Sequence, residues 1–273
     1  MLERLGTWDM VAIVVVIVLI YALIYPRYQI WGIQHKRLKK IQRMERKWKS
    51  KVLTMIHRKE AISLLGIPVY QFIDVEDAEE ILRGIRKAKG RPIDLIIHTP
   101  GGQMHASIQI ARTLKSYPAR TRVMIPHYAM SSGTIIALAA DEIVMDKNAV
   151  LGPIDPQVGD FVRGIFPAPS WVRISEHKGT DADDATLIIG DISEKALDLM
   201  RSVTRELLED KFSDKEKLDK VVEKLVSGEM VHIHPISASE ARSLGLPVST
   251  ELPEEVHEFM SLYRAVKASV QYL

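Results

Sequence analysis

Uncharged apolar residues fill one long stretch near the start of the chain. From Met10 to Tyr25 the sequence MVAIVVVIVLIYALIY has no charged residue, and its length is close to the roughly 20 residues with which a helix spans a bilayer. A cleavable signal peptide would carry positive charges before the apolar run and a small-residue cleavage site after it. Here Pro26 and Arg27 follow instead. We therefore expect an uncleaved, single-pass membrane anchor over residues 1–27.

The next segment is strongly basic and has a helical apolar stripe. Residues 35–51 read HKRLKKIQRMERKWKSK, and the apolar positions recur at intervals of three or four: Leu38, Ile41, Met44, Trp48 and Val52. Such a helix after an anchor is typical of a segment that lies on anionic headgroups, so we expect a basic juxtamembrane helix over residues 28–59. Because Lys and Arg mark the cytoplasmic side, we expect a cytoplasmic catalytic domain. A nucleic-acid patch and a solvated helix face are the alternatives, and we expect no nucleic-acid partner.

Strand-like and helix-like segments alternate after residue 60. We expect strands at 66–74, 92–99 and 122–129 and helices at 75–90, 101–117 and 132–140. Short connections favour parallel strands covered by helices, so an α/β domain of repeated βα units is expected over residues 60–250. Residues 168–187 are less regular, and residues 251–273 predict an amphipathic C-terminal helix. Active groups in such folds gather at the carboxyl ends of the strands.

The composition narrows the possible chemistry. The 273 residues are 47% hydrophobic and 26% charged, with a net charge of +2 and no cysteine. Without cysteine, disulfides, thiolate metal sites and cysteine nucleophiles are excluded. No Walker loop and no dinucleotide-binding fingerprint occurs in the sequence. We expect no cofactor.

Two strand-to-helix junctions carry candidate chemistry. In IIHTPGGQMHAS, Gly101 and Gly102 turn the chain from a strand into a helix, where backbone N–H groups can face a ligand oxygen. In PHYAMSSGTII, Ser131 stands at the start of the next helix, where serine is a common cap. The alternative is that Ser131 is a nucleophile and that the N–H groups of Gly102 and Ser132 stabilise the oxyanion. The second interpretation requires the two junctions to lie side by side.

Three motifs carry a resemblance to a known superfamily. HTPGGQMHASIQIARTL, AMSSGTIIALAADEIVMDKNAVLGPIDPQ and ISASEARSLGLPV resemble, in order and spacing, the Clp-fold (crotonase-like) serine peptidases. Among the families of this superfamily, the chain is similar to the membrane-bound SDH (serine dehydrogenase proteinase) family, which is related to signal peptide peptidase A and NfeD. The resemblance covers most of residues 60–250. It implies a ClpP/crotonase-like fold, a peptide or protein substrate and a homo-oligomer.

The resemblance also implies roles for single residues. Ser131 becomes the nucleophile, and Gly102 and Ser132 supply the backbone N–H groups of the oxyanion hole. The side chain of Ser132, one residue later, is expected to point elsewhere. The residues expected to line the site are Gly101, His98 and Gly133.

The general base is the open question at this site. ClpP has a histidine about two dozen residues after its serine, but the corresponding stretch here, AVLGPIDPQ, contains none. Signal peptide peptidase A and NfeD use a lysine further along, and in this chain Lys178 and Lys195 are the two candidates. A lysine acts as a base only where burial lowers its pKa.

Other polar residues have simpler explanations. His98 and His127 follow strand ends, where a satisfied core histidine is the commoner role. His232 and His234 form a His-x-His pair with no carboxylate or third ligand nearby in sequence, and DADD at 181–184 lacks the glycine and terminal glutamate of a calcium loop. We expect no metal site.

The apolar segment predicts a membrane anchor, and the resemblance implies a serine peptidase with a Ser-Lys dyad. A different enzyme class remains open, namely a crotonase-like acyl-CoA enzyme whose oxyanion hole holds a thioester enolate. A membrane scaffold that kept the fold but lacks a working base is the third hypothesis. It predicts that Lys178 and Lys195 are both exposed.

Overall fold

The computed structural model describes residues 6–57, 71–160, 162 and 164–263. In this part of the chain a five-stranded sheet has the order β1-β2-β3-β5-β10. Its strands are β1 (Lys51–Ile56), β2 (Ile93–His98), β3 (Thr121–Ile125), β5 (Glu142–Met145) and β10 (Val248–Ser249). Every neighbouring pair is parallel. The expected α/β architecture with a parallel sheet is confirmed.

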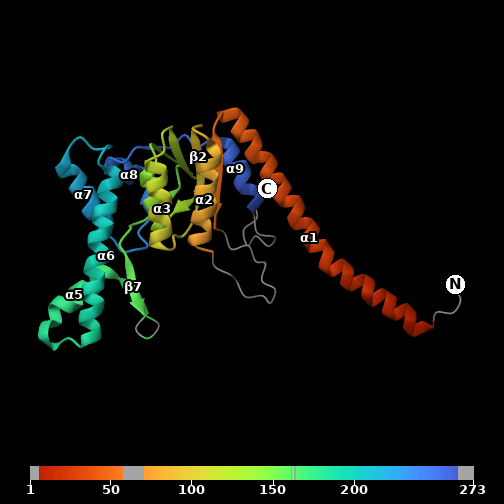
Figure 1. Ribbon diagram of the computed structural model, residues 1–273, viewed down its shortest axis with the longest axis horizontal. Coiled ribbons are helices and arrows are strands. Elements are labelled where there is room, and N and C mark those ends of the chain that lie inside the picture. Colours follow the sequence, from red (N-terminus) through yellow and green to blue (C-terminus); the bar gives the residue numbers. More distant parts are fainter. Residues whose placement is uncertain (1–5, 58–70, 161, 163, 264–273) are drawn as a thin grey trace.

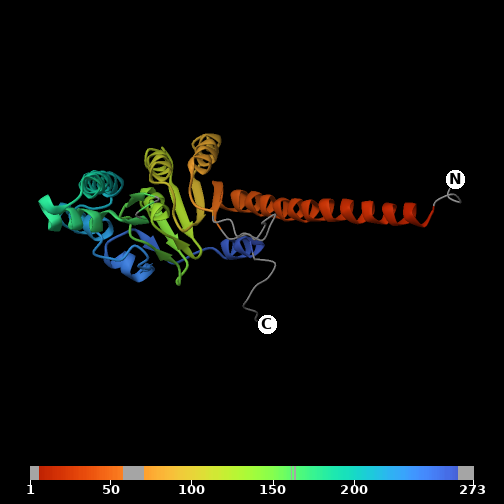
Figure 2. The ribbon, with the colours of Figure 1, turned by 90° about the horizontal axis from the view of Figure 1, so that it is seen from below.

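The side chains of this sheet alternate between two hydrophobic layers, as the period of a strand requires. Leu95 and Ile97 of β2 belong to the larger layer, whereas Ile96 belongs to the smaller one. The larger layer contains residues of α2 (Val75–Ala88), α3 (Met104–Lys115), α4 (Ser132–Ala139), α6 (Asp184–Leu208), α7 (Lys215–Val226) and α8 (Ala238–Ser243). The smaller layer contains residues of α1 (Thr7–Trp48) and α9 (Glu254–Met260). Figure 2 shows helices on both faces of the sheet.

Helix α1 continues without interruption from the apolar segment into the basic one. Its apolar stripe packs on the sheet, because Met44 is buried in the smaller layer and Ile41 and Trp48 pack against that layer. The helix ends at Trp48 and is followed by β1, so the expected helix over residues 28–59 is wrong for residues 51–56, while residues 58 and 59 lie outside the described residues. Residues 51–56 form an edge strand instead. The end of the basic segment is therefore a structural part of the body.

Charge pairs reinforce this docking. Lys40 forms an ion pair with Glu258, and Lys47 forms one with Glu255, so basic residues of α1 face acidic residues of α9. The Lys47 hydrogen bond lowers the pKa of the Glu255 carboxyl. Because these pairs are largely exposed, each contributes only modestly to stability. The C-terminal amphipathic helix, expected over 251–273, is short: a 3₁₀ turn (Ser261–Tyr263) follows α9, and residues 264–273 lie outside the description.

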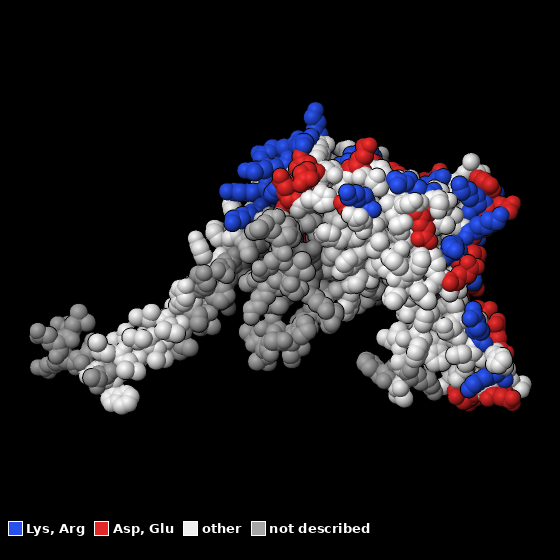
Figure 3. All heavy atoms as spheres, turned by 180° about the vertical axis from the view of Figure 1, so that it is seen from behind, with Lys and Arg blue, Asp and Glu red and all other residues white. Residues whose placement is uncertain are grey.

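The N-terminal half of α1 projects from the body (Figure 1). The large apolar side chains described on it are exposed, from 84% at Trp8 to 45% at Ile13. In Figure 3 this half carries no blue or red, whereas Lys and Arg gather over the C-terminal half. Parts of the expected anchor, residues 1–5 and the side chains of residues 7, 9, 19 and 22–27, lie outside the described residues. Within those that are described, no helix has the length and hydropathy of a membrane span.

Two smaller sheets complete the described fold. The first pairs β4 (Tyr128–Ala129) with β6 (Val150–Leu151), and β6 with β9 (Ile236–Ser237). The second is a hairpin of β7 (Gln157–Asp160) and β8 (Gly164–Pro167). With α5 (Ala168–Lys178) and the N-terminal half of α6, the hairpin forms an arm that extends away from the sheet (Figure 1). The irregular segment expected at 168–187 is thus wrong, since most of it is helical.

Candidate active site

The two strand-to-helix junctions lie side by side. Ser132 Oγ donates a hydrogen bond to the Gly102 carbonyl at 2.9 Å. The backbone N–H of Met130 donates to the Thr99 carbonyl at 3.0 Å, so the strand ends before the two turns are also joined. A Cβ placed on Gly101 would lie 3.0 Å from the Cβ of Ser131. The adjacency that a nucleophile and its oxyanion hole require is therefore present.

Ser131 has a strained backbone and is not a helix cap. Its φ and ψ are 49° and −116°, a region that costs a non-glycine residue on the order of 1–3 kcal/mol. It occupies the N-cap position of α4, yet its side chain makes no capping hydrogen bond. The simpler interpretation of Ser131 as a cap is wrong. A strained serine on a sharp strand-to-helix turn is typical of an exposed nucleophile.

Two backbone donors flank this hydroxyl. Among the described residues, neither the Gly102 N–H nor the Ser132 N–H donates to a protein acceptor. The Gly101 carbonyl accepts from the Ile73 N–H at 2.8 Å, and because the peptide is trans, the Gly102 N–H points away from Ile73. The Ser132 N–H belongs to the first turn of α4, where the helix dipole adds positive potential. Such a pair of donors can stabilise the oxyanion of a tetrahedral intermediate.

Glycine is required at two positions for different reasons. A Cβ on Gly102 would lie 2.2 Å from the Ile73 carbonyl oxygen and 2.3 Å from its nitrogen, so no side chain fits. A Cβ on Gly133 would lie 2.6 Å from Thr99 Cγ2. Gly102 thus lets the turn approach the backbone of residue 73, and Gly133 lets α4 pack closely on Thr99.

The segment LGPIDPQ runs beside the nucleophile. Gly152 exchanges two hydrogen bonds with the Thr134 hydroxyl of α4, at 2.9 and 3.0 Å. A Cβ on Gly152 would lie 3.3 Å from the Ser131 nitrogen. Further along, buried Asp155 contacts His232, with Nδ1 2.8 Å from the carboxylate. The sequence placed no carboxylate near His232, but the pairing of β6 with β9 brings one there.

Neither candidate lysine contacts Ser131. Lys178 is exposed in the last turn of α5, and Lys195 on α6 is 73% exposed and paired with Asp191 at 2.6 Å. In the described part of the chain no hydrogen bond joins either amine to Ser131. The exposure of both lysines is what the scaffold hypothesis predicts, and in the described part of the chain neither Lys178 nor Lys195 forms a dyad with Ser131.

The other candidate residues have structural roles. His98 is 3% exposed, and its ring lies 4.1 Å from that of Tyr128 and 5.4 Å from that of His127. His234 contacts Glu240 at 3.2 Å. Asp183 of the DADD segment caps α6 by accepting from the Thr186 N–H. No group of three or more potential metal ligands occurs among the residues that the structure describes.

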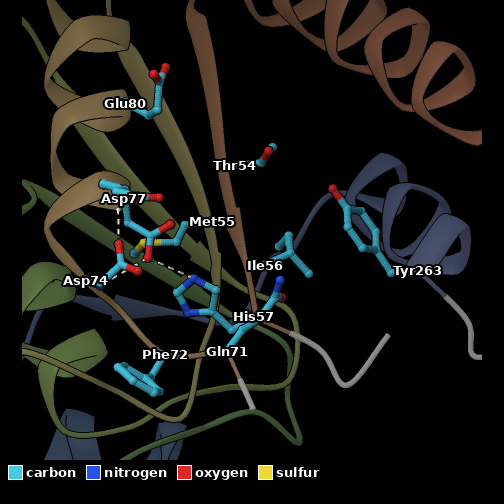
Figure 4. A pocket seen from close by; sticks show the side chains of 11 residues that line it. Thr54, Met55, Ile56, His57, Gln71, Phe72, Asp74, Asp77, Glu80 and Tyr263 are labelled. Carbon is cyan, nitrogen blue, oxygen red and sulfur yellow. Dashed lines mark hydrogen bonds and ion pairs between the residues drawn. The ribbon is translucent and has the colours of Figure 1, made fainter. Parts of the chain in front are cut away.

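A buried polar chain behind the turn was not found from the sequence. The Thr99 hydroxyl accepts from the Gly101 N–H at 3.2 Å and lies 2.8 Å from His57 Nδ1, while His57 Nε2 lies 3.2 Å from Asp77 (Figure 4). Burial raises the pKa of the Asp77 carboxyl, but hydrogen bonds from His57 and from the Asp74 backbone hold that pKa below its ordinary value. The signal available in sequence was Thr99, which directly precedes the Pro-Gly-Gly turn.

Comparisons with known proteins show the family to which the chain belongs. Residues 4–273 match the family of ClpP-like SDH-type serine proteinases. Two uncharacterized proteins of Methanocaldococcus jannaschii are similar to this chain. MJ0137 is 52% identical over 246 residues, which cover 89% of this chain and 84% of that protein. MJ1495 is 49% identical over 258 residues, which cover 92% of this chain and 85% of that protein. A mutant of the 1510-N membrane-bound stomatin-specific protease has a similar fold, with a TM-score of 0.51 and 16% identity over 76% of this chain and 82% of that one.

Proposed function

Since the chain belongs to the family of ClpP-like SDH-type serine proteinases, we propose that it is a membrane-anchored peptidase whose nucleophile is Ser131. Serine peptidase activity follows from the family. The observation that carries the assignment of Ser131 is its strained, uncapped position beside two donors without a protein acceptor. The family match also favours a peptidase over an acyl-CoA enzyme.

The proposed mechanism uses groups that the two junctions hold together. Ser131 Oγ attacks a peptide carbonyl of a peptide or protein substrate, and a base takes its proton. The N–H groups of Gly102 and Ser132 stabilise the oxyanion that forms. The amine product leaves with a proton, and water then hydrolyses the acyl-enzyme in the same manner. The residues of this mechanism need no cofactor.

We assign the base to a lysine, either Lys178 or Lys195, as the resemblance to signal peptide peptidase A implies. Because both are exposed in one chain, either would need a second surface to bury it and lower its pKa. The arm offers exposed apolar residues for such a surface: Val162, Ile165, Phe166, Ile174 and Ile188. Their exposure supports a homo-oligomer in which the arm is covered. A contact through the C-terminal helix is less favoured, since Val256 and Phe259 are buried within their own chain.

The proposed anchor is the N-terminal half of α1. Its exposed apolar side chains support insertion in a bilayer, and the basic residues after it support contact with anionic cytoplasmic headgroups. This orientation places the catalytic domain in the cytoplasm. A tag on the C-terminus that a membrane-impermeant protease removes from intact cells would contradict it.

Peptide-library cleavage by the detergent-purified full-length protein, read by mass spectrometry, tests the proposed activity. We expect cleavage by the wild type and none by Ser131→Ala. Equal cleavage by both would exclude Ser131 as the nucleophile. No cleavage by either, together with turnover of an acyl-CoA thioester, would favour the crotonase-like alternative.

The base is tested by Lys178→Ala and Lys195→Ala in the same assay. The matched control is Lys220→Ala, because Lys220 forms an exposed helical pair with Glu216 as Lys195 does with Asp191. We expect one of the two variants to lose at least 100-fold in kcat and the control to keep wild-type activity.

His232→Gln belongs in the same series, because His232 Nδ1 contacts Asp155 and an imidazole held in this way can act as a base through Nε2. Loss of activity in that variant alone would show that His232, and not a lysine, is the general base.

A further inference from the structure

A continuous chain of hydrogen bonds links α2 to the Pro-Gly-Gly turn. Asp77 contacts His57 Nε2, His57 Nδ1 contacts the Thr99 hydroxyl, and this hydroxyl accepts from the Gly101 N–H. His57 is 8% exposed and Thr99 is fully buried. Figure 4 shows the His57 ring directed toward Asp77 from the end of β1. The proposed mechanism uses none of these three side chains.

The donors and acceptors of this chain agree in direction when His57 is neutral and carries its proton on Nε2. His57 then donates to the Asp77 carboxylate, and Nδ1 accepts from the Thr99 hydroxyl. The same hydroxyl oxygen remains available to accept from Gly101. A carboxylate that fixes the tautomer of an imidazole makes the other ring nitrogen a defined acceptor, so Asp77 and His57 determine where the Thr99 hydroxyl points.

The other end of the chain reaches the proposed oxyanion donor. Thr99 Oγ1 accepts from the Gly101 N–H at 3.2 Å, and it lies 3.3 Å from the Gly101 oxygen, to which it donates only when its single proton is not given to His57 Nδ1. The Gly101 carbonyl and the Gly102 N–H share one peptide plane. Holding Gly101 therefore sets the direction of the Gly102 N–H. Thr99 also packs against Gly133 through its methyl group, which joins the turn to α4.

A second path connects α2 to the same turn. Asp74 and Asp77 form a reciprocal capping box at the start of α2. The residue before this cap, Ile73, donates to the Gly101 carbonyl at 2.8 Å and accepts from the Gln103 N–H at 2.7 Å. Asp77 thus belongs to both paths, through its side chain to His57 and through the cap to Ile73.

We propose that His57 and Thr99 are positioning residues of the peptidase: with Asp77 they hold the Gly101–Gly102 peptide so that its N–H faces the oxyanion. The inference rests on the proposed function, because the oxyanion forms only if Ser131 is the nucleophile. Neither side chain is assigned contact with the substrate. Their loss is therefore expected to reduce kcat and to leave KM nearly unchanged, which is the result of weaker binding of the transition state alone.

The test compares variants of Thr99 in the full-length protein. Thr99→Val keeps the shape and the contact with Gly133 but loses the hydroxyl, and Thr99→Ser restores the hydroxyl. We expect Thr99→Val to lower kcat about 10- to 100-fold, Thr99→Ser to recover most of it, and His57→Phe to match Thr99→Val. Thr204→Val is the control, since Thr204 is a buried threonine whose hydroxyl bonds within α6. It is expected to change stability and not kcat.

A second readout does not depend on activity. In protein labelled with ¹⁵N-glycine, the amide resonances of Gly101 and Gly102 are expected to shift in Thr99→Val and His57→Phe and to stay in place in Thr204→Val. Unchanged resonances in both variants would overturn the inference even if the wild type cleaves no peptide. Cleavage by wild type and by Thr99→Val at equal kcat would overturn it while leaving the proposed function intact. The proposed function itself fails if the wild-type protein cleaves no peptide, or if its cleavage does not depend on Ser131.

Discussion

Ser132 Oγ donates a hydrogen bond to the Gly102 carbonyl, so the residue after the proposed nucleophile holds the proposed oxyanion turn. Ser132 is 2% exposed, and its backbone N–H is the second oxyanion donor of the proposed mechanism. One residue thus supplies a donor with its backbone and fixes the other donor with its side chain. This contact joins the two turns that carry the donors.

Replacing Ser132 by alanine tests that contact. We expect a loss of about 0.5–1.5 kcal/mol in unfolding free energy, because the partly buried hydrogen bond to the Gly102 carbonyl is lost, and about a 10-fold lower kcat. The matched control is Ser107→Ala, since Ser107 is equally buried and its hydroxyl bonds the Met104 carbonyl within α3. Urea denaturation and peptide cleavage measure the two effects. A control that loses as much kcat as Ser132→Ala would contradict the account.

Glycine at position 131 is expected to stabilise the protein while abolishing cleavage. The positive φ of 49° at Ser131 costs conformational free energy, whereas glycine adopts such a backbone with little strain. Ser131→Gly should therefore raise the unfolding free energy by about 1 kcal/mol. Ser132→Gly, within the first turn of α4, should lower it. Urea denaturation of both variants distinguishes strain at the nucleophile from a general effect of glycine, and a less stable Ser131→Gly protein would argue against stored strain.

Alanine at position 102 is expected to disrupt the turn. The added Cβ would lie within 2.7 Å of three backbone atoms of Ile73, which cannot move aside as a flexible side chain would. We expect Gly102→Ala to lower the unfolding free energy by at least about 3 kcal/mol and to abolish cleavage. Gly32→Ala in α1 is the control, because nothing lies within 4 Å of a Cβ there. Thermal unfolding of a Gly102→Ala protein at the wild-type temperature would refute this geometry.

Stability is expected to rise above pH 8 because of Lys211. Burial lowers the pKa of Lys211 to about 8, the charge of Lys115 lowers it further, and Asp210 and Asp141 oppose the shift. Its amine donates to the Leu138 carbonyl at the end of α4. Because the unfolded chain binds this proton up to a pKa near 10.5, unfolding takes up a proton between the two values and the unfolding free energy grows with pH.

The size of this rise is up to about 3 kcal/mol between pH 8 and pH 10.5. Urea denaturation across this range measures it, and Lys211→Met is the control because it removes the titrating group and keeps an apolar stem. We expect the wild-type free energy to rise relative to the variant. Parallel curves for the two proteins would show that Lys211 has an ordinary pKa.

The sequence predicted the parts of this fold whose signals are local. The strands at 93–98 and 121–125 contain short apolar runs, LII and VMI, and the interpretation of Ser131 as a nucleophile required the two junctions that follow them to lie side by side. Strand β1 was missed because KVLTMI follows a basic helix with no breaker between them. Helix α5 was missed because it begins with APSW, which carries turn-forming residues.

The backbone donors proposed for the site have a local signal in the sequence. The side-chain contacts around the site depend on the pairing of distant strands and were missed. Gly102 and Ser132 follow from turn geometry. The contact of His57 with Thr99 needs β1 beside β2, and the contact of Asp155 with His232 needs β6 beside β9, so neither has a local signal. The base was assigned by resemblance, and a single chain leaves Lys178 and Lys195 in solvent.

Covalent labelling tests the central claim most directly. The full-length protein in detergent is treated with a fluorophosphonate, digested, and mapped by mass spectrometry, alongside Ser131→Ala and Ser132→Ala. The account predicts one modified residue, Ser131, with no label in Ser131→Ala and slower labelling at Ser131 in Ser132→Ala. Label on Ser132, or equal labelling of wild type and Ser131→Ala, would show that Ser131 is not the nucleophile.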